Sequence, residues 1–453
     1  MKRRGTFFIL ILSFLINPSF AQNTNWQIVS GRITTPWAGK VDPLRPLPEY
    51  PRPQLVRKNW QNLNGLWQYA IIAGESETIP AGYEGEILVP YPVESALSGV
   101  GKNVGKENTL WYKREITVEK ARKNKRFLLH FGAVDWKTNV YVNGKKAGSH
   151  EGGYDPFSFD ITALLKKGTR QEIVVGVWDP SDEGPQPRGK QVRKPEGIWY
   201  TPVSGIWQTV WLETVPVSYI VSTKHTVNFD QNTLTVEAKT EGTQAGDQLY
   251  VAALKDGNVL NEQSVKPGTK AVLTISNPVH WSPDNPYLYD LKFKIIRKGK
   301  AIDEADSYFA FRKVSMGKDS KGIQRMLLNN KFVFQYGPLD QGWWPDGLYT
   351  APTDEALLFD IQKTKAMGFN MIRKHVKVEP ARWYYHCDQK GILVWQDMPS
   401  GDMGGNKWDM RPGIISGRNH DKSRSSESEA IYKKEWKAIT EALYNFPSIV
   451  VWV

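Results

Sequence analysis

The stretch that most constrains the fold is Phe369–Pro399, which reads FNMIRKHVKVEPARWYYHCDQKGILVWQDMP. It starts with a short apolar run that turns cationic, and it ends with a second apolar run that closes on an acid. The segment between them has a helical pattern, with Pro380 near its first turn and Gly391 past its end. Two apolar strands joined by one helix predict a parallel βαβ unit. In α/β folds, ligands bind at the carboxyl ends of such strands.

The same alternation recurs over residues 315–453. Besides the βαβ unit, we expect an apolar strand in Leu328–Trp344, a helix over Asp354–Met367, a second helix over Ser426–Asn445 and a buried strand in Ser448–Val453. The order is then β-α-β-α-β-α-β, which is the first half, strands 1 to 4, of a (β/α)₈ TIM barrel. A closed barrel needs about 250 residues, roughly twice what this region offers. We therefore expect the sequence to be the N-terminal part of a longer protein, truncated within the barrel.

Two all-β domains are expected before this region. Residues 59–213 contain short alternating strands separated by turn signals, with Asn143-Gly144 as a hairpin turn, and predict a jelly-roll sandwich. Residues 214–314 contain about six or seven strands and no cysteine, which fits an immunoglobulin-like β-sandwich. Residues 22–58 are Pro-rich with little periodicity and predict an extended N-terminal arm.

The first residues, 1–21, have the pattern of a secretory signal peptide. Three cations at Lys2–Arg4 precede an apolar run, and Ser19 and Ala21 occupy the small-residue positions of a cleavage site. The apolar run is too short to span a bilayer, and no later stretch is apolar enough to do so. We expect an exported protein, periplasmic or extracellular, without a membrane partner.

The composition limits the classes of partner that the protein is expected to bind. The formal net charge is +12, but the cations are scattered and no nucleic-acid motif accompanies them, so nucleic acid is not an expected partner. The chain has one cysteine, Cys387, and therefore no internal disulfide, so a large core has to stabilise it. The 18 Trp residues favour a carbohydrate partner, because aromatic faces stack on sugar rings as well as filling cores.

Several motifs, in this order, resemble glycoside hydrolase family 2, which includes β-galactosidases, β-glucuronidases and β-mannosidases. The resemblance implies a jelly-roll sugar-binding domain, an immunoglobulin-like domain and a (β/α)₈ catalytic barrel. The motifs are VPYPVESALSG (Val89–Gly99), LWYKREI (Leu110–Ile116), VYVNGKKAGSHEGGYDPFSFDIT (Val140–Thr162), GIWYTPVSGIWQTVWLE (Gly197–Glu213), NMIR (Asn370–Arg373), CDQKGILVWQD (Cys387–Asp397) and NFPSIVVW (Asn445–Trp452).

The resemblance implies an exo-acting retaining glycosidase, in which a carboxylic acid and a carboxylate nucleophile lie about 5 Å apart. In the family the acid/base is the Glu of an Asn-Glu pair beyond strand four, and the nucleophile is a Glu at the end of strand seven. The sequence reaches Val453 before either position, so we expect no catalytic residue in it and no activity from this fragment alone. Some family members use Mg²⁺ or Na⁺, but no metal-ligating pattern is legible here, so no cofactor or metal residue is assigned.

The substrate-side residues are the remaining candidates. By resemblance, Arg373 would support the nucleophile and His375 would contact the sugar, although the spacing between them differs from that in β-galactosidases and β-glucuronidases. The other expected substrate contacts lie at the ends of the first and third predicted strands: Asp340, Trp343, Trp344 and Asp397.

Each candidate has a structural alternative. Arg373 and Asp397 would form a buried ion pair, His375 would be a core histidine, and the two Trp residues would pack under a loop. The run HEGGYDPF, His150–Phe157, is interpreted as turn chemistry, a sugar contact or an inter-domain contact. A non-catalytic carbohydrate-binding protein that uses only the jelly roll is the alternative function. The particular sugar and the oligomeric state stay open.

Overall fold

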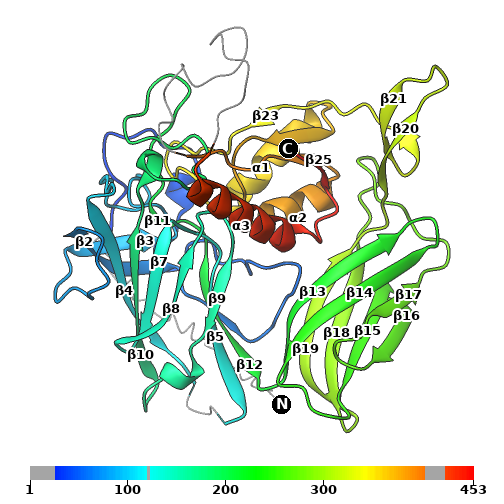
Figure 1. Cartoon of the computed structure of the whole chain (residues 1–453), viewed down its shortest axis with the longest axis horizontal. Coiled ribbons are helices and arrows are strands. Elements are labelled where there is room, and N and C mark those ends of the chain that lie inside the picture. The colour runs from blue at the N-terminus through cyan, green and yellow to red at the C-terminus, as the bar shows by residue number, and fades with distance from the viewer. Residues whose placement is uncertain (1–25, 120–122, 403–423) are drawn as a thin grey trace, which may run out of the picture.

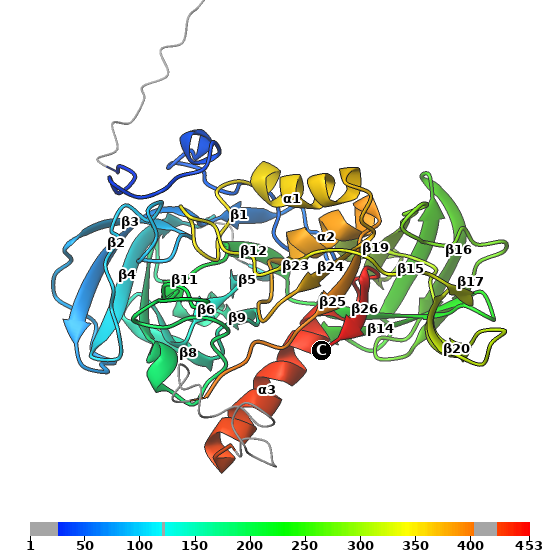
Figure 2. The same cartoon turned by 90° about the horizontal axis from the view of Figure 1, so that it is seen from above.

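The computed structural model describes residues 26–119, 123–402 and 424–453. Two β-sandwiches lie on opposite sides of the molecule, and a parallel βα unit with three helices lies between them (Figure 1). The view from above shows the same three-part arrangement (Figure 2). The predicted signal peptide, residues 1–21, lies outside the described residues. Within those residues, no helix is both long enough and apolar enough to cross a bilayer.

The first β-sandwich has a six-stranded sheet, ordered β3-β2-β4-β10-β7-β8, and a four-stranded sheet, ordered β1-β12-β5-β9. A short pair, β11 and β6, adds a third ladder. The predicted Asn143-Gly144 turn joins β7 to β8, with positive φ at both residues. The strands are β1 (Trp60–Asn62), β2 (Gly65–Ala73), β3 (Gly85–Val89), β4 (Asn108–Thr117), β5 (Lys125–Phe131), β6 (Val134–Asp135), β7 (Lys137–Val142), β8 (Lys145–Glu151), β9 (Phe157–Asp160), β10 (Arg170–Trp178), β11 (Gly205–Ile206) and β12 (Val210–Pro216).

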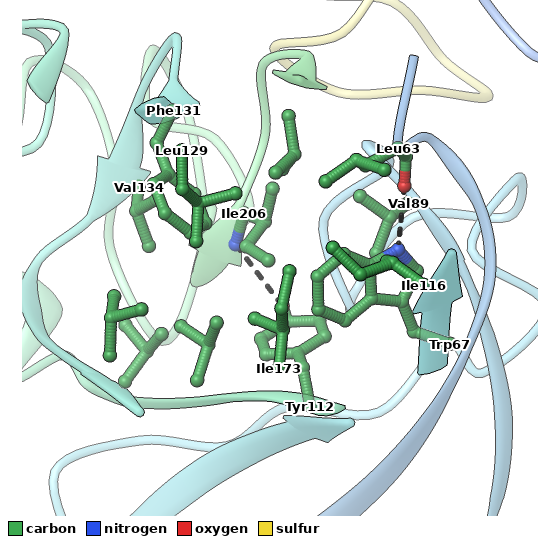
Figure 3. Packing of buried hydrophobic residues seen from close by; sticks show 14 of the residues in the cluster. Leu63, Trp67, Val89, Tyr112, Ile116, Leu129, Phe131, Val134, Ile173 and Ile206 are labelled. Atoms are coloured by element: carbon green, nitrogen blue, oxygen red, sulfur yellow. Dashed lines mark hydrogen bonds between the residues drawn. The ribbon is translucent and has the colours of Figure 1, made fainter. Parts of the chain in front are cut away.

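The core between the two sheets contains aliphatic and aromatic side chains from both (Figure 3). Two polar ring groups in this core have partners. The indole of Trp67 donates to the Leu63 carbonyl at 2.9 Å, and the Tyr112 hydroxyl accepts from the Ile206 amide at 3.1 Å. Because buried polar groups cost free energy only when they are unpaired, these large rings are accommodated with little penalty.

The second β-sandwich has sheets ordered β13-β14-β17 and β16-β15-β18-β19, so its seven strands agree with the predicted number. Alternation is clear in β18, where every second side chain enters the core, as expected for a sheet with one solvated face. The strands are β13 (Tyr219–Asn228), β14 (Thr233–Glu241), β15 (Gln248–Lys255), β16 (Asn258–Val265), β17 (Ala271–Thr274), β18 (Tyr289–Arg297) and β19 (Lys300–Phe309).

The third part contains a parallel sheet ordered β23-β24-β25-β26, with a helix after each of the first three strands. The predicted βαβ unit is confirmed, since β24 and β25 pair in parallel with α2 between them. The elements are β23 (Leu339–Asp340), α1 (Asp354–Ala366), β24 (Met371–Lys374), α2 (Ala381–Lys390), β25 (Leu393–Gln396), α3 (Ser426–Leu443) and β26 (Ile449–Trp452). Four strands and three helices thus follow the predicted order. They are an open sheet, so closure into a barrel stays a prediction.

The predicted first strand is wrong in its extent. Leu328 belongs to a separate antiparallel sheet of β20 (Val314–Lys318), β21 (Gln324–Leu328) and β22 (Lys331–Phe332). Asn329 and Asn330 both have positive φ, which makes a tight turn that folds the chain back on itself. The parallel sheet therefore begins only at β23, with two residues.

The helices begin and end where local signals predict. The Thr353 side chain accepts the Ala356 amide at 3.1 Å and caps α1, and Gly368 follows the helix with φ 86°. Gly391 ends α2 in the left-handed conformation, φ 69°. These local stops set the lengths of the two αβ connections, which lead from α1 into β24 and from α2 into β25.

Candidate functional site

The candidate site lies at the carboxyl ends of β24 and β25, on the sheet face turned away from the helices. Side chains alternate along a strand. Ile372 and Val394 pack into the core that includes all three helices, whereas Met371 and Leu393 pack into a separate cluster with Trp281 of the second sandwich. Arg373 follows Met371 by two residues and therefore shares its face.

Arg373 and Asp397 are joined by two parallel hydrogen bonds. Arg373 Nε donates to Asp397 Oδ1 at 2.9 Å, and Nη2 donates to Oδ2 at 3.0 Å. The Asp397 side chain is 4% exposed and that of Arg373 37% exposed. The ion-pair alternative is therefore present in the structure. It does not exclude a substrate contact, because the guanidinium keeps an open side.

His375 completes this cluster. Its Nε2 lies 3.9 Å from Asp397 Oδ2, and its amide donates to the Asp340 carbonyl at 2.8 Å. Partial burial lowers the pKa of the imidazole. The Asp397 carboxylate opposes this effect, while Lys190 and Arg373 add to it. The imidazole is thus held toward its neutral form, in which one ring nitrogen donates and the other accepts a hydrogen bond.

Asp340 lies apart from this cluster because it belongs to a buried network on the helix side. Lys374 Nζ donates to Asp340 Oδ2 at 2.5 Å and to Glu379 Oε1 at 2.8 Å, and it lies over the Trp383 ring at 4.3 Å. Although burial acts to raise it, Lys374 holds the pKa of Asp340 below its usual value. With its carboxylate occupied in this way, Asp340 stabilises the strand ends in the structure, and its sugar contact stays a prediction.

Lys377 extends the network to the loop after β23. Its Nζ lies 2.9 Å from Glu379 Oε1 and donates to the carbonyls of Gly342, at 2.6 Å, and Tyr349, at 2.9 Å. Burial lowers the pKa of Lys377 to about 8. Gly342 has φ 63°, and a Cβ there would meet Glu379 Oε1 at 2.3 Å, so only glycine fits. The network therefore fixes the loop that carries the predicted aromatic pair.

The two predicted Trp residues face different partners. The Trp343 ring stacks on Tyr200 of the first sandwich, with centroids 4.6 Å apart. Trp344 meets Trp37 of the N-terminal arm edge to face at 6.1 Å. Trp343 thus forms an aromatic surface shared between two domains, while Trp344 packs against the arm.

A loop of the first sandwich reaches the same strand ends. The amides of Arg188 and Gly189 both donate to the Ser400 carbonyl at 2.8 Å. Gly189 has φ 61°, and a Cβ there would lie 2.5 Å from the Val376 carbonyl oxygen, so the loop touches the segments after both β24 and β25. Lys190 follows directly and is half-buried.

The run His150–Phe157 makes an inter-domain contact. The amides of Gly153 and Tyr154 donate to Glu435 Oε1 of α3 at 2.8 and 3.2 Å. The Tyr154 hydroxyl lies 3.1 Å from that of Tyr349. Of the three interpretations of this run, the structure shows the inter-domain contact.

A cavity of about 310 Å³ lies elsewhere, between the arm, the first sandwich, α2 and α3. Trp207, Trp211 and Phe446 are among its lining residues, and none of the six predicted site residues is. Within the three described ranges, no group of three or more His, Cys, Asp or Glu side chains is placed to hold a metal ion.

Sequence reasoning missed Lys190, Tyr200, Lys374 and Lys377. For the two strand-end lysines a signal existed, because a cation on the buried face of a strand requires carboxylate partners. For Lys190 and Tyr200 no local signal exists, because tertiary folding alone brings their loop to the strand ends.

Comparison with known families agrees with this architecture. The pattern of "Glycosyl hydrolases family 2, sugar binding domain" matches residues 83–216, and that of "Glycosyl hydrolases family 2" matches residues 213–312. The two sandwiches and the parallel βα unit together define a multi-domain protein whose first two domains match one family. The chain belongs to glycosyl hydrolases family 2.

Two curated relatives illustrate the similarity. A β-galactosidase of Thermoanaerobacter pseudethanolicus is 27% identical over 338 residues, 68% of this chain and 43% of the relative. A β-glucuronidase of Formosa agariphila is 26% identical over 384 residues, 75% of this chain and 38% of the relative. The chain thus spans about two fifths of the length of the curated relatives it matches.

Solved structures show the same fold. A β-glucuronidase from Ruminococcus gnavus in complex with D-glucaro-δ-lactam aligns with a TM-score of 0.68 at 20% identity, over 90% of this chain and 68% of that chain. A β-D-glucuronidase of Dictyoglomus thermophilum aligns with a TM-score of 0.68 at 23% identity, over 89% of this chain and 67% of that chain. At this identity the likeness concerns the fold alone.

Proposed function

We propose that this chain is the N-terminal part of an exo-acting retaining glycoside hydrolase, which releases a terminal sugar from an oligo- or polysaccharide. The observation that carries the proposal is the Arg373–Asp397 pair at the carboxyl ends of β24 and β25, in a family 2 chain. Relatives named β-galactosidase and β-glucuronidase support the reaction class. They support no single sugar.

The retaining mechanism needs a general acid and a carboxylate nucleophile about 5 Å apart. The family places both beyond strand four of the barrel, at positions that the given sequence does not contain. We propose that a longer gene product supplies both and that residues 1–453 alone are inactive. The lengths of the relatives, more than twice that of their matched parts, support this proposal.

Within that enzyme, Arg373 would orient the nucleophile through the open side of its guanidinium, because a second carboxylate can share a planar fork already held by Asp397. Asp397 keeps the guanidinium in place. His375, held toward its neutral form, would donate or accept a hydrogen bond with a sugar hydroxyl. Trp343 and Tyr200 would form an aromatic wall beside the ring.

The deciding experiment has two parts. The gene is sequenced past the codon for Val453, and its complete product is assayed on a panel of 4-nitrophenyl β-glycosides. The proposal expects an open frame with an Asn-Glu pair within a few residues, and hydrolysis with retention at the anomeric carbon. A stop codon there, with sugar binding and no hydrolysis, would instead establish the non-catalytic carbohydrate-binding alternative.

We also propose export to the periplasm or the medium, from the signal-peptide pattern of residues 1–21. N-terminal sequencing of the protein from the native cell is expected to start at Gln22. Recovery of an intact Met1 terminus from the cytoplasmic fraction would refute export.

A further inference from the structure

We propose that Lys190, carried by the sugar binding domain, binds an anionic substituent of the sugar, either a carboxylate or a sulfate ester. This inference rests on the proposed function and adds a substrate class and a residue to it.

The position of Lys190 is set by its neighbours in the loop. The Ser400 carbonyl accepts both preceding amides at 2.8 Å, and Gly189 packs on the Val376 carbonyl. Residues 187 and 401 also form a β-bridge. The loop is therefore attached to the segments that follow β24 and β25, and its next side chain lies beside the cluster of Arg373 and His375.

Lys190 differs from the cations of the strand ends in its charge partners. On the helix side, Lys374 pairs with Asp340 and Glu379, and Lys377 pairs with Glu379, at N–O distances of no more than 2.9 Å. On the open side, Asp397 neutralises Arg373. Arg188 of the same loop donates to the carbonyls of Gly189 and Gln191, and the carboxylates of Asp182 and Asp402 act on its charge. Among the described residues, no carboxylate lies within ion-pair distance of Lys190, so within this part of the chain its ammonium has no counter-ion.

This cation acts on the site, because the charge of Lys190 lowers the pKa of His375. Lys190 is itself half-buried, and burial lowers the pKa of its ammonium. A half-buried ammonium with no carboxylate partner in the described part of the chain has lost part of its hydration, and an anionic ligand would replace the lost interactions. An ammonium binds carboxylate and sulfate oxygens alike as a point charge, so both substituents fit.

The test compares anionic and neutral substrates on the complete gene product. The substrates are 4-nitrophenyl β-D-glucuronide and β-D-galacturonide, 4-nitrophenyl β-D-galactoside 6-sulfate, and the neutral glucoside and galactoside. An anionic glycoside is expected to have the highest kcat/KM, with a preference that falls as ionic strength rises. The uronide and sulfate arms distinguish the two kinds of anion.

Two variants make the test specific to the lysine. Lys190→Gln is expected to lower kcat/KM on the preferred anionic substrate by about 10- to 100-fold, mainly through KM, and on the neutral one by less than about twofold. Lys194→Gln removes the same charge from an exposed position of the same loop and is expected to change neither. A preference for neutral substrates, or an anionic preference that survives Lys190→Gln, would overturn the inference.

Failure of the proposed function gives a different result, namely no hydrolysis of any substrate. The inference is then decided by calorimetric binding of D-glucuronate, D-galactose 6-sulfate and D-glucose to the same protein. Tighter binding of an anion that is lost in Lys190→Gln but kept in Lys194→Gln supports it. Equal binding of the anions and D-glucose overturns it.

Discussion

Replacing Asp388 by Ala is expected to weaken the attachment of the parallel βα unit to the second sandwich. The Asp388 carboxylate accepts the Tyr308 hydroxyl at 2.7 Å and the Ser448 amide at 2.8 Å, and its carbonyl accepts the Trp281 indole at 2.8 Å. Tyr308 and Trp281 belong to the second sandwich, and all four residues are buried. Asp388 is therefore a hydrogen-bonding centre at a dry interface.

The magnitude follows from the groups left unpaired. In Asp388→Ala the hydroxyl of Tyr308 and the amide of Ser448 lose their acceptors, and each unpaired buried donor costs about 1–3 kcal/mol. The expected loss is therefore about 2–6 kcal/mol. Asp388→Asn keeps one oxygen acceptor and adds an amide that the tyrosine oxygen can accept, so its expected loss is about 1 kcal/mol.

Both variants are also expected to differ from wild type in the pH dependence of their stability, because neither keeps the Asp388 carboxyl. Burial raises the pKa of Asp388 to about 7 from a usual value of 3.8. A group that binds its proton more tightly in the folded state contributes stability at low pH, and this contribution is lost as pH rises from about 4 to about 7. Asp388→Asn has no such group. Its stability relative to wild type is therefore expected to improve over that range.

Hydrogen exchange read by mass spectrometry is the assay, since a multi-domain chain does not unfold in one step. Peptides covering Trp281, Tyr308 and α2 are expected to lose protection in Asp388→Ala, while peptides of the first sandwich are unchanged. Gln389→Ala, an exposed neighbour on the same helix, is the control. Equal loss in the Asn and Ala variants, or no loss at the interface, would refute the reasoning.

Three further outcomes are expected. In urea denaturation, Arg373→Gln is expected to lower the free energy of unfolding by about 2–3 kcal/mol, because it leaves the buried Asp397 carboxylate unpaired. Asp397→Asn is expected to lower it by only about 1 kcal/mol, because the arginine reaches water. Equal losses in the two variants would contradict this asymmetry. Although burial acts to raise it, Arg52 holds the pKa of Glu213 far below its usual value, so stability is lost as pH falls below about 4, and acid titration of Glu213→Gln should lack that loss. Burial raises the pKa of Glu435 to about 8, so the stability that its protonated form contributes should be lost as pH rises from about 4.5 to 8, and thermal melts should show this as a falling Tm. Glu435→Gln still accepts both amides, so its Tm should lack this pH-dependent fall.

The helices and the βαβ unit could be predicted because their signals are local. Thr353, Gly368 and Gly391 act on the backbone within one turn, whatever the rest of the chain does. The first strand could not be placed, because an apolar run has the same period in a parallel and in an antiparallel sheet. The turn at Asn329-Asn330, where both residues have positive φ, places Leu328 in the antiparallel sheet, and the apolar pattern does not predict that turn.

The site divides along the same line. Arg373, His375 and Asp397 could be predicted to meet, since the carboxyl ends of neighbouring parallel strands share one edge of a sheet. Side chains alternate between the two faces of a strand, and this alternation places Asp340 on the opposite face from Arg373, His375 and Asp397. The contribution of the first sandwich could not be predicted, because the contact between Gly189 and Ser400 joins segments far apart in the sequence.

The two faces of the parallel sheet therefore have different electrostatic roles. On the helix side the buried ammonium groups of Lys374 and Lys377 have carboxylate partners, and an unpaired charge there would cost several kcal/mol, so these residues serve stability. On the opposite side the Arg373 guanidinium keeps an open side, and Lys190 has no carboxylate partner among the described residues. A cation without a carboxylate partner is tolerated where solvent or a ligand supplies the missing hydrogen bonds. This difference between the two faces supports the proposed binding side independently of any resemblance, and under the proposal it requires a ligand of negative charge.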